Sequence, residues 1–268
     1  MKTIPVQDVA LAYQEYGSGQ PIVLLHGFCG SSAYWEQVIP LLQDAGRIIV
    51  PDLRGHGQSS APEQDIYTME AYAEDIEQLL TALEADHPIV LGHSLGGYIT
   101  LALAEKLGSQ AGSRLAGFGL IHSTAETDTP QGRDGRDKGI ATIREFGIAA
   151  FVDGLIPKLF APAHLDSMPE QVEQAKAIGY GTSATAAAAT QQGMKERADR
   201  NSVLARAQVP VLLVAGAHVG VIPPERTFST VQESFTPVTL EAAGHMSMLE
   251  APAELAAIIR AFAARCSS

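Results

Sequence analysis

The sequence has only two cysteines, Cys29 and Cys266, in 268 residues. They lie far apart along the chain, so they form neither a disulfide framework nor the closely spaced ligands of a metal motif. A chain that depends on neither is typical of a reducing compartment. We therefore expect a cytoplasmic protein.

Long apolar runs are also lacking. No run reaches the roughly 20 residues that span a bilayer, and the stretch MKTIPVQDVALAYQEYG has no apolar signal-peptide region. Basic residues are scarce, with 18 Lys and Arg against 30 Asp and Glu and a net charge of −12. Because phosphate binding needs clustered basic residues, we expect neither a membrane nor a nucleic-acid partner.

Buried strands and amphipathic helices alternate in the first half of the chain. Continuous apolar runs that stop at glycine or polar turns are typical of strands covered on both faces. Such runs occur at residues 21–27, 47–55, 87–94 and 115–123. Between the second and third runs, residues 69–86 place apolar side chains at the spacing of one helix face. This alternation predicts an α/β fold with a mostly parallel sheet flanked by helices.

The pattern changes in the middle of the chain. Residues 123–205 contain no clear strand, and three stretches there are typical of helices divided by proline and glycine, at residues 139–160, 169–181 and 185–199. Strand patterns return at residues 209–216 and 236–244, and a helix is expected over 252–266. We therefore predict a core domain of residues 1–122 and 206–268 with a helical cap, or lid, of residues 123–205.

The strongest chemical motif is the stretch LGHSLGGY, which contains G-x-S-x-G at residues 92–96. It follows a predicted strand and precedes a predicted helix, which is the context that this motif requires. Such a turn holds the serine, here Ser94, in a strained conformation with its hydroxyl free above the sheet. The motif predicts a nucleophile elbow with Ser94 as the nucleophile.

Two further motifs complete a candidate site. The loop HGFCGSS after the first buried strand could aim the backbone N–H of Phe28 at the same point as that of Leu95, which would form an oxyanion hole. We interpret His26 in this loop as structural, and Trp35 as a candidate pocket residue. His245, in GHMSMLE after the last predicted strand, suits a general base that reaches Ser94.

Other residues near these motifs receive no chemical role. Of the eight histidines, His56, His93 and His122 are lesser candidates for the base. The side chain of His93 is expected to point away from Ser94. Glu250 is interpreted as the beginning of the C-terminal helix.

These motifs together resemble the α/β-hydrolase superfamily, and within it the serine-nucleophile esterases, lactonases and carbon–carbon hydrolases. The segments HGF, PDLRGHGQS, GHSLGG, PVLLVAG and GHMSMLE follow in the family's order over essentially the whole chain. The resemblance implies Ser94 as nucleophile, His245 as base, and Phe28 and Leu95 as oxyanion donors, with no metal or organic cofactor. It also implies that PDLRGHGQS is a structural turn.

One position departs from the family pattern. The loop after VLLVAG usually reads Gly-x-x-Asp, and counting from Gly216 places Val219 where the triad acid would stand. A valine cannot accept the hydrogen bond that orients the histidine, and loss of that acid typically costs about 10⁴ in kcat. Three explanations stay open: Glu126 or Asp128 after the fourth strand supplies the acid, the change inactivates an intact site, or the pocket serves a non-hydrolytic purpose.

The expected activity follows from the resemblance. We expect hydrolysis of a small ester or lactone through an acyl-enzyme, impaired by Val219, and the apolar cap segments predict an uncharged small-molecule substrate. The competing hypothesis is a catalytically silent protein that binds a small molecule. A homodimer through the cap helices or the sheet edge stays open.

Overall fold

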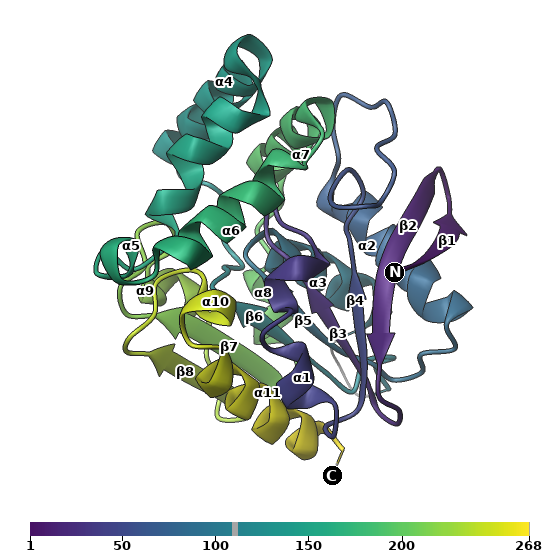
Figure 1. The fold of residues 1–268 in the computed structure, drawn as a ribbon. Helices are drawn as coiled ribbons and strands as arrows, with labels where there is room; N and C mark the ends of the chain where they lie inside the picture. The colour runs from purple at the N-terminus through teal and green to yellow at the C-terminus, as the bar shows by residue number, and fades with distance from the viewer. Residues whose placement is uncertain (109–111, 268) are drawn as a thin grey trace.

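The structure, a computed structural model, describes residues 1–108 and 112–267. Among these residues the centre is an eight-stranded sheet with the order β1-β2-β4-β3-β5-β6-β7-β8 (Figure 1). The strands are β1 Lys2–Val6, β2 Val9–Tyr16, β3 Pro21–Leu25, β4 Arg47–Pro51, β5 Ile89–His93, β6 Gly117–Ile121, β7 Val211–Gly216 and β8 Phe235–Leu240. All pairs from β4 to β8 are parallel, whereas β1–β2 and β2–β4 are antiparallel. The predicted mostly parallel α/β sheet is confirmed.

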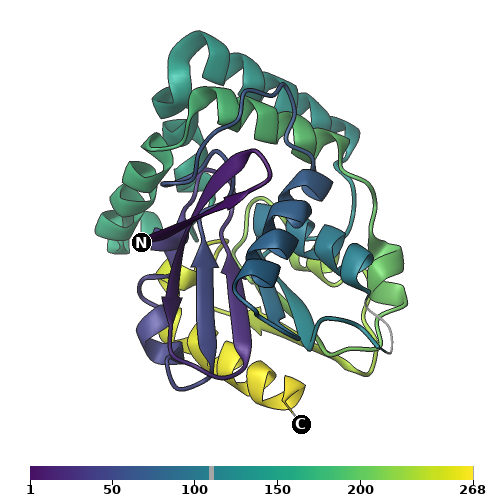
Figure 2. The same ribbon diagram turned by 90° about the vertical axis from the view of Figure 1, so that its right-hand side faces the viewer.

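Helices cover both faces of this sheet. The helices are η1 Ser32–Trp35, α1 Ile39–Leu42, α2 Met69–Ala82, α3 Leu95–Leu107, α4 Pro130–Leu155, η2 Ile156–Lys158, α5 His164–Ser167, α6 Pro169–Tyr180, α7 Ala184–Glu196, α8 Asn201–Ala205, α9 Pro224–Thr227, α10 Ser247–Glu250 and α11 Pro252–Cys266. Helices α2 and α3 lie on one face, and α1 and α11 lie on the other (Figure 2). The sheet is therefore buried on both sides, which explains the continuous apolar strands.

The N-terminal hairpin β1–β2 had no clear sequence signal. Its turn places Gln7 at a φ of 46°, in the left-handed region that glycine or asparagine usually occupies. β1 is short, largely exposed and contains Pro5, as suits an edge strand. Neither the turn nor the strand matches the patterns from which hairpins are predicted.

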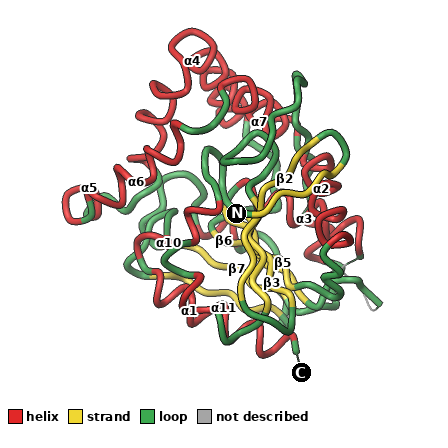
Figure 3. The backbone as a smooth tube through the Cα atoms, turned by 45° about the vertical axis from the view of Figure 1, so that its right-hand side comes forward, coloured by secondary structure: helices red, strands yellow, loops and turns green. Residues whose placement is uncertain are grey.

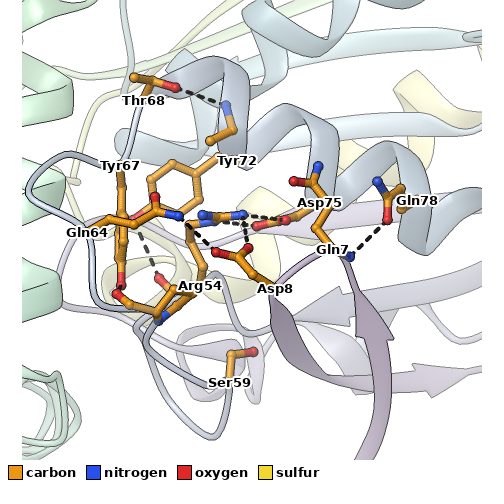
Figure 4. A network of polar contacts seen from close by, with 12 residues as sticks. Gln7, Asp8, Arg54, Ser59, Gln64, Tyr67, Thr68, Tyr72, Asp75 and Gln78 are labelled. Atoms are coloured by element: carbon orange, nitrogen blue, oxygen red, sulfur yellow. Dashed lines mark hydrogen bonds and ion pairs between the residues drawn. The ribbon is translucent and has the colours of Figure 1, made fainter.

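Helix α2 buries the face that its sequence predicts, together with one charged residue. Thr68 caps its N-terminus by accepting a hydrogen bond from the N–H of Ala71. Among the apolar residues on the buried face lies Asp75, whose side chain is 1% exposed. Its position is explained by Arg54, which reaches it from the turn after β4 (Figure 4).

The Arg54–Asp75 ion pair is bidentate and almost fully buried. The guanidinium of Arg54 donates from Nε and Nη2 to the two carboxylate oxygens of Asp75, at 2.6 and 2.7 Å. It also contacts Asp8 of the β1–β2 turn at 3.3 Å and lies over the ring of Tyr67 (Figure 4). These contacts join the N-terminal hairpin, the turn after β4 and α2 in one network.

The segment between β6 and β7 consists of helices and connecting loops, with no strand within the described residues. Its helices α4, α6 and α7 lie beyond one end of the sheet, above the strands in Figures 2 and 3. Helix α4 begins at Pro130, earlier than predicted, with Thr129 as its N-cap, and Gly147 interrupts it at a φ of 83°. The division into a core and a cap of residues 123–205 stays a prediction, and the predicted core range includes residues 109–111 and 268, which lie outside the described residues.

The two cysteines are unpaired, as expected. Cys29 is buried in the hydrophobic core and Cys266 is half-buried near the end of α11. None of the helices in the described ranges is long and apolar enough to cross a membrane. The cytoplasmic setting stays a prediction.

Candidate active site

Ser94 stands at the turn between β5 and α3 in a strained backbone conformation, with a φ of 50° and a ψ of −111°. A non-glycine residue held there costs about 1–3 kcal/mol, which the surrounding structure must offset. Gly92 permits the turn, because a Cβ atom at that position would collide with the backbone of Gly96. The N–H of Ser94 donates to the carbonyl of Ile121 at 2.9 Å, which ties the elbow to β6.

The loop after β3 lies against this elbow. A Cβ atom at Gly27 would lie 3.3 Å from the Cβ of Ser94, so the loop backbone passes close to the serine. Within the described part of the chain, the backbone N–H groups of Phe28 and Leu95 donate no hydrogen bond. Both groups are therefore available to an oxyanion, although their role stays a prediction.

His26 in the same loop has a structural role, as the sequence indicates. Its Nε2 accepts a hydrogen bond from the N–H of Leu53 at 3.0 Å, and its Nδ1 donates to the carbonyl of Gly27 at 2.8 Å. Both ring nitrogens are occupied, so His26 has no free atom with which to transfer a proton.

His245 lies in the loop between β8 and α10, and it lines the same cavity as Ser94. Its N–H donates to the carbonyl of Leu159, just after η2, at 2.7 Å. Its buried Nδ1 has no hydrogen-bond partner among the described residues. This is the atom to which a triad acid would bind, and no carboxylate occupies that place.

Two further imidazoles pack against His245. The ring centroids of His93 and His122 lie 5.0 and 5.6 Å from that of His245. The Nε2 of His93 donates to the carbonyl of His245 at 2.9 Å, and the Nε2 of His122 pairs with the hydroxyl of Ser247 at 2.7 Å. Burial lowers the pKa of His93 to about 4. Burial and these two imidazoles also hold the pKa of His245 well below its usual value.

Val219 lies in the loop after β7 and is half-buried. The neighbouring His218 donates its N–H to the carbonyl of Ala243 at 3.1 Å, which holds the two loops together. The assignment of Val219 to the position of the triad acid rests on the sequence pattern and stays a prediction.

Glu126 and Asp128, the alternative acids, contact arginines rather than His245. Glu126 accepts from Nε of Arg226 at 2.7 Å. Asp128 accepts from Arg136 at 3.0 Å and from Arg197 at 2.8 Å. Burial alone would raise the pKa of the Asp128 carboxyl, but the two arginines outweigh burial and hold that pKa below its usual value. Asp128 is therefore a charged, largely buried partner of two arginines.

The cavity above Ser94 has a volume of about 410 Å³. Phe28, Tyr98, Phe151, Leu159 and His245 are among its lining residues. Trp35 is not among them, because its side chain is fully buried in the core cluster. The lining also includes Asp128, Arg136 and Arg226. The apolar cap segments predicted an uncharged substrate, but charged side chains also line this cavity.

A second, larger hollow of about 680 Å³ lies between the loop before α2 and helices α4 and α7. Its lining includes Glu63, Asp65 and Arg144 but neither Ser94 nor His245. Of these two cavities, only the smaller is lined by both the predicted nucleophile and the predicted base.

Glu250 holds the loop of His245, a function that the sequence interpretation missed. Its side chain is fully buried, and its Oε2 accepts from the N–H groups of Gly244 and Met246 at 2.9 and 3.0 Å. Its Oε1 accepts from the N–H of Ala161 at 2.7 Å and pairs with Nδ1 of His164 at 2.8 Å. One carboxylate thus fixes both neighbours of His245 and joins them to the segment after η2.

Replacing Glu250 with glutamine is expected to lower kcat about 10-fold or more with a smaller change in KM. An amide has one acceptor oxygen, so buried N–H donors lose their partner at about 1–3 kcal/mol each, and His245 loses its fixed position. Steady-state kinetics on an ester substrate measure the effect. Glu254→Gln, an exposed change at the start of α11, is the matched control, and equal kinetics in both variants would contradict the assignment.

The family follows from comparison with known proteins. A family model described as the alpha/beta hydrolase fold matches residues 20–252. The chain belongs to this family. An esterase of Thermogutta terrifontis, solved with malate bound, superimposes with a TM-score of 0.93 over 100% of both chains at 28% identity.

Enol-lactonases are among the similar proteins. A 3-oxoadipate enol-lactonase of Acinetobacter baylyi is 28% identical over 264 residues, which cover 93% of this chain and 91% of the relative. An enol-lactonase of Burkholderia xenovorans shares the fold with a TM-score of 0.88 at 23% identity over 97% of this chain and 99% of that one. An uncharacterised protein of Mycobacterium tuberculosis is 40% identical over 113 residues, and the chain spans only about a third of that relative's length.

Proposed function

We propose that this protein is a serine hydrolase that cleaves a small carboxylic ester or lactone through an acyl-enzyme. The observation that carries the proposal is that Ser94, in its strained elbow, lines one cavity together with Phe28 and His245. Leu95 follows Ser94 directly, and within the described residues the backbone N–H groups of Phe28 and Leu95 donate no hydrogen bond. The similarity to an esterase and to an enol-lactonase supports an ester-like substrate.

In the proposed mechanism His245 takes the proton of Ser94 as its hydroxyl oxygen attacks the carbonyl carbon. The N–H groups of Phe28 and Leu95 stabilise the oxyanion of the tetrahedral intermediate. His245 then gives the proton to the leaving oxygen, and the alcohol departs. A water molecule, deprotonated by His245, cleaves the acyl-enzyme and releases the acid. Residues 123–205 serve as the cap that shields these steps from bulk water.

We further propose that Val219 lowers the rate of this mechanism but leaves the nucleophile, the base and the oxyanion hole in place. The Nδ1 of His245 is buried without a partner in the described residues, so nothing selects its tautomer or stabilises the imidazolium that forms. The lowered pKa of His245 points the same way, because the imidazolium is poorly supported in this environment. The loss corresponds to about 5 kcal/mol of transition-state stabilisation.

The proposed function is tested by turnover of a short-chain 4-nitrophenyl ester. The native chain should hydrolyse the ester slowly but above the buffer rate. Ser94→Ala should lower kcat by at least about 10²-fold, because the nucleophile is lost. Ser202→Ala, an exposed serine in α8, is the control and should leave turnover unchanged. Equal rates in native protein and Ser94→Ala would refute the serine mechanism.

One observation favours the second candidate, a catalytically silent binding protein. Within the described residues Ser94 and His245 share a cavity but no hydrogen bond joins their side chains. A silent protein would bind a small molecule in the 410 Å³ cavity without a covalent intermediate. Saturable binding combined with no turnover and no modification of Ser94 would favour this candidate.

A further inference from the structure

The cavity above Ser94 has lining residues of two chemical kinds. The loop after β3 and the end of α4 contribute apolar side chains, Phe28, Phe151 and Leu155. The start of α4 and α9 contribute Arg136 and Arg226, and we call these two arginines the cationic side of the cavity. A substrate in this cavity therefore meets both apolar carbon and fixed positive charge.

Both arginines are held in place while part of each stays available. Arg136 donates from Nη1 to the side-chain oxygen of Gln191 at 3.1 Å, in addition to its bond to Asp128. Arg226 donates from Nη2 to the carbonyl of Thr127 at 2.8 Å, in addition to its bond to Glu126. Nη2 of Arg136 and Nη1 of Arg226 bond to no other described residue. The side chains are 22% and 23% exposed, so each can bind a ligand that enters the cavity.

The charges of this cluster do not cancel. Arg136, Arg197 and Arg226 face two carboxylates, Glu126 and Asp128. Three cations against two anions leave one positive charge, although the whole chain carries a net charge of −12. A net positive charge in the cavity of the predicted nucleophile is unexpected in so acidic a protein, and a negatively charged ligand would explain it.

We propose that this cationic side is a carboxylate-binding subsite, and that the substrate is an ester or lactone that carries a free carboxylate. The inference rests on the proposed function and names its substrate class. A single residual charge fits a monoanionic carboxylate better than a phosphate, which carries about −1.5 to −2 at neutral pH. Guanidinium groups bind carboxylates through paired, charge-assisted hydrogen bonds. The uncharged substrate that the apolar cap segments suggested is replaced by this class.

A matched pair of substrates tests the subsite. Mono-4-nitrophenyl glutarate carries a free carboxylate, and its methyl ester is the neutral counterpart with the same scissile bond. The native chain should favour the anionic ester in kcat/KM by roughly 10- to 100-fold, as a hydrogen bond to a charged group contributes about 1.5–3 kcal/mol. Succinate and adipate analogues show which distance between carboxylate and scissile carbonyl fits best.

Substitution of the arginines assigns that preference to the subsite. Arg226→Gln should lower the anionic-to-neutral ratio about 10-fold or more, mainly through KM, and Arg226→Lys should restore part of it. Arg136→Gln is the second variant in case Arg226→Gln folds poorly, which circular dichroism would reveal. Arg144→Gln, an exposed arginine of α4 outside this cavity, should leave the ratio unchanged.

The outcomes separate the subsite from the proposed function. If both esters are cleaved equally well, or if the arginine variants keep the ratio, the subsite is refuted while the hydrolase stands. If neither ester is cleaved, binding of monomethyl glutarate is measured by calorimetry to test the subsite separately. If the native chain binds monomethyl glutarate and Arg226→Gln binds it more weakly, the subsite is supported although the hydrolase function is not. If the native chain does not bind it, the subsite is refuted.

Discussion

Replacing Val219 with aspartate is expected to raise kcat for a short-chain 4-nitrophenyl ester by about 10³-fold or more. The loop after β7 runs beside the loop of His245, since His218 bonds to Ala243. The buried Nδ1 of His245 has no partner in the described residues, so a carboxylate there would select the reactive tautomer and stabilise the imidazolium. Steady-state kinetics of the native chain and Val219→Asp, measured side by side, check the prediction.

The same substitution should change the dependence of activity on pH. His245 acts as a base only when neutral, so activity is lost as the pH falls through its pKa. In the native chain burial lowers that pKa well below the usual value. A neighbouring carboxylate raises it, so the acidic limb of kcat/KM should move to higher pH in Val219→Asp.

Val219→Asn is the control for this prediction. It has nearly the shape of Val219→Asp without the charge and should gain far less. A fast native chain that gains nothing from Val219→Asp would mean that the acid lies elsewhere, and Glu126 and Asp128 would be the next residues to replace. If the native chain, Val219→Asp and Val219→Asn all fail to hydrolyse the ester, the ester-hydrolase assignment is contradicted.

Replacing Asp75 with leucine is expected to lower the free energy of unfolding by about 3–5 kcal/mol, because it removes the buried, bidentate partner of Arg54 and leaves only the more distant contact with the exposed Asp8. Arg54 is 1% exposed and its guanidinium depends on the two oxygens of Asp75 (Figure 4). For a chain of this length the Tm should fall by on the order of 10 °C. Thermal and urea denaturation of the native chain and Asp75→Leu measure the loss.

Two comparisons sharpen the stability prediction. Glu74 lies on the same helix but pairs with Lys106 at the surface, so Glu74→Gln should cost at most about 1 kcal/mol. The double variant Arg54→Met/Asp75→Leu removes both charges and should recover most of the loss. If Asp75→Leu costs no more than Glu74→Gln, the ion pair does not support the fold as described.

The sequence predicted those parts of the fold that depend on periodicity. The strands from β3 to β8 and the buried face of α2 follow from apolar patterns that packing on a sheet requires. The N-terminal hairpin was not predicted because Gln7 has a positive φ in its turn, and glutamine does not indicate such a turn in a sequence. The beginning of α4 escaped because three glycines, Gly132, Gly135 and Gly139, weaken the helical pattern, although Thr129 and Pro130 form a typical helix start.

The motifs of the candidate site could be predicted because each lies within a short segment of the sequence. Ser94 lies between Gly92 and Gly96 directly after β5, and His245 follows Gly244 in the loop after β8. The structure brings both residues to one cavity. The roles of Glu250, Arg136 and Arg226 depend on contacts between distant segments. Glu250 bonds to Ala161, 89 residues away, and Arg226 bonds to Glu126, 100 residues away. No local pattern contains such contacts, so only the folded chain reveals them.

The measurement that tests the central claim most directly is modification by a serine-directed fluorophosphonate, followed by mass spectrometry of the intact and digested native chain. An intact site that lacks only its orienting acid should take up one adduct, on Ser94, slowly in the native chain and much faster in Val219→Asp. No adduct in either protein, or an adduct on another residue, would contradict the claim that this chain retains the nucleophile, base and oxyanion hole of a serine hydrolase.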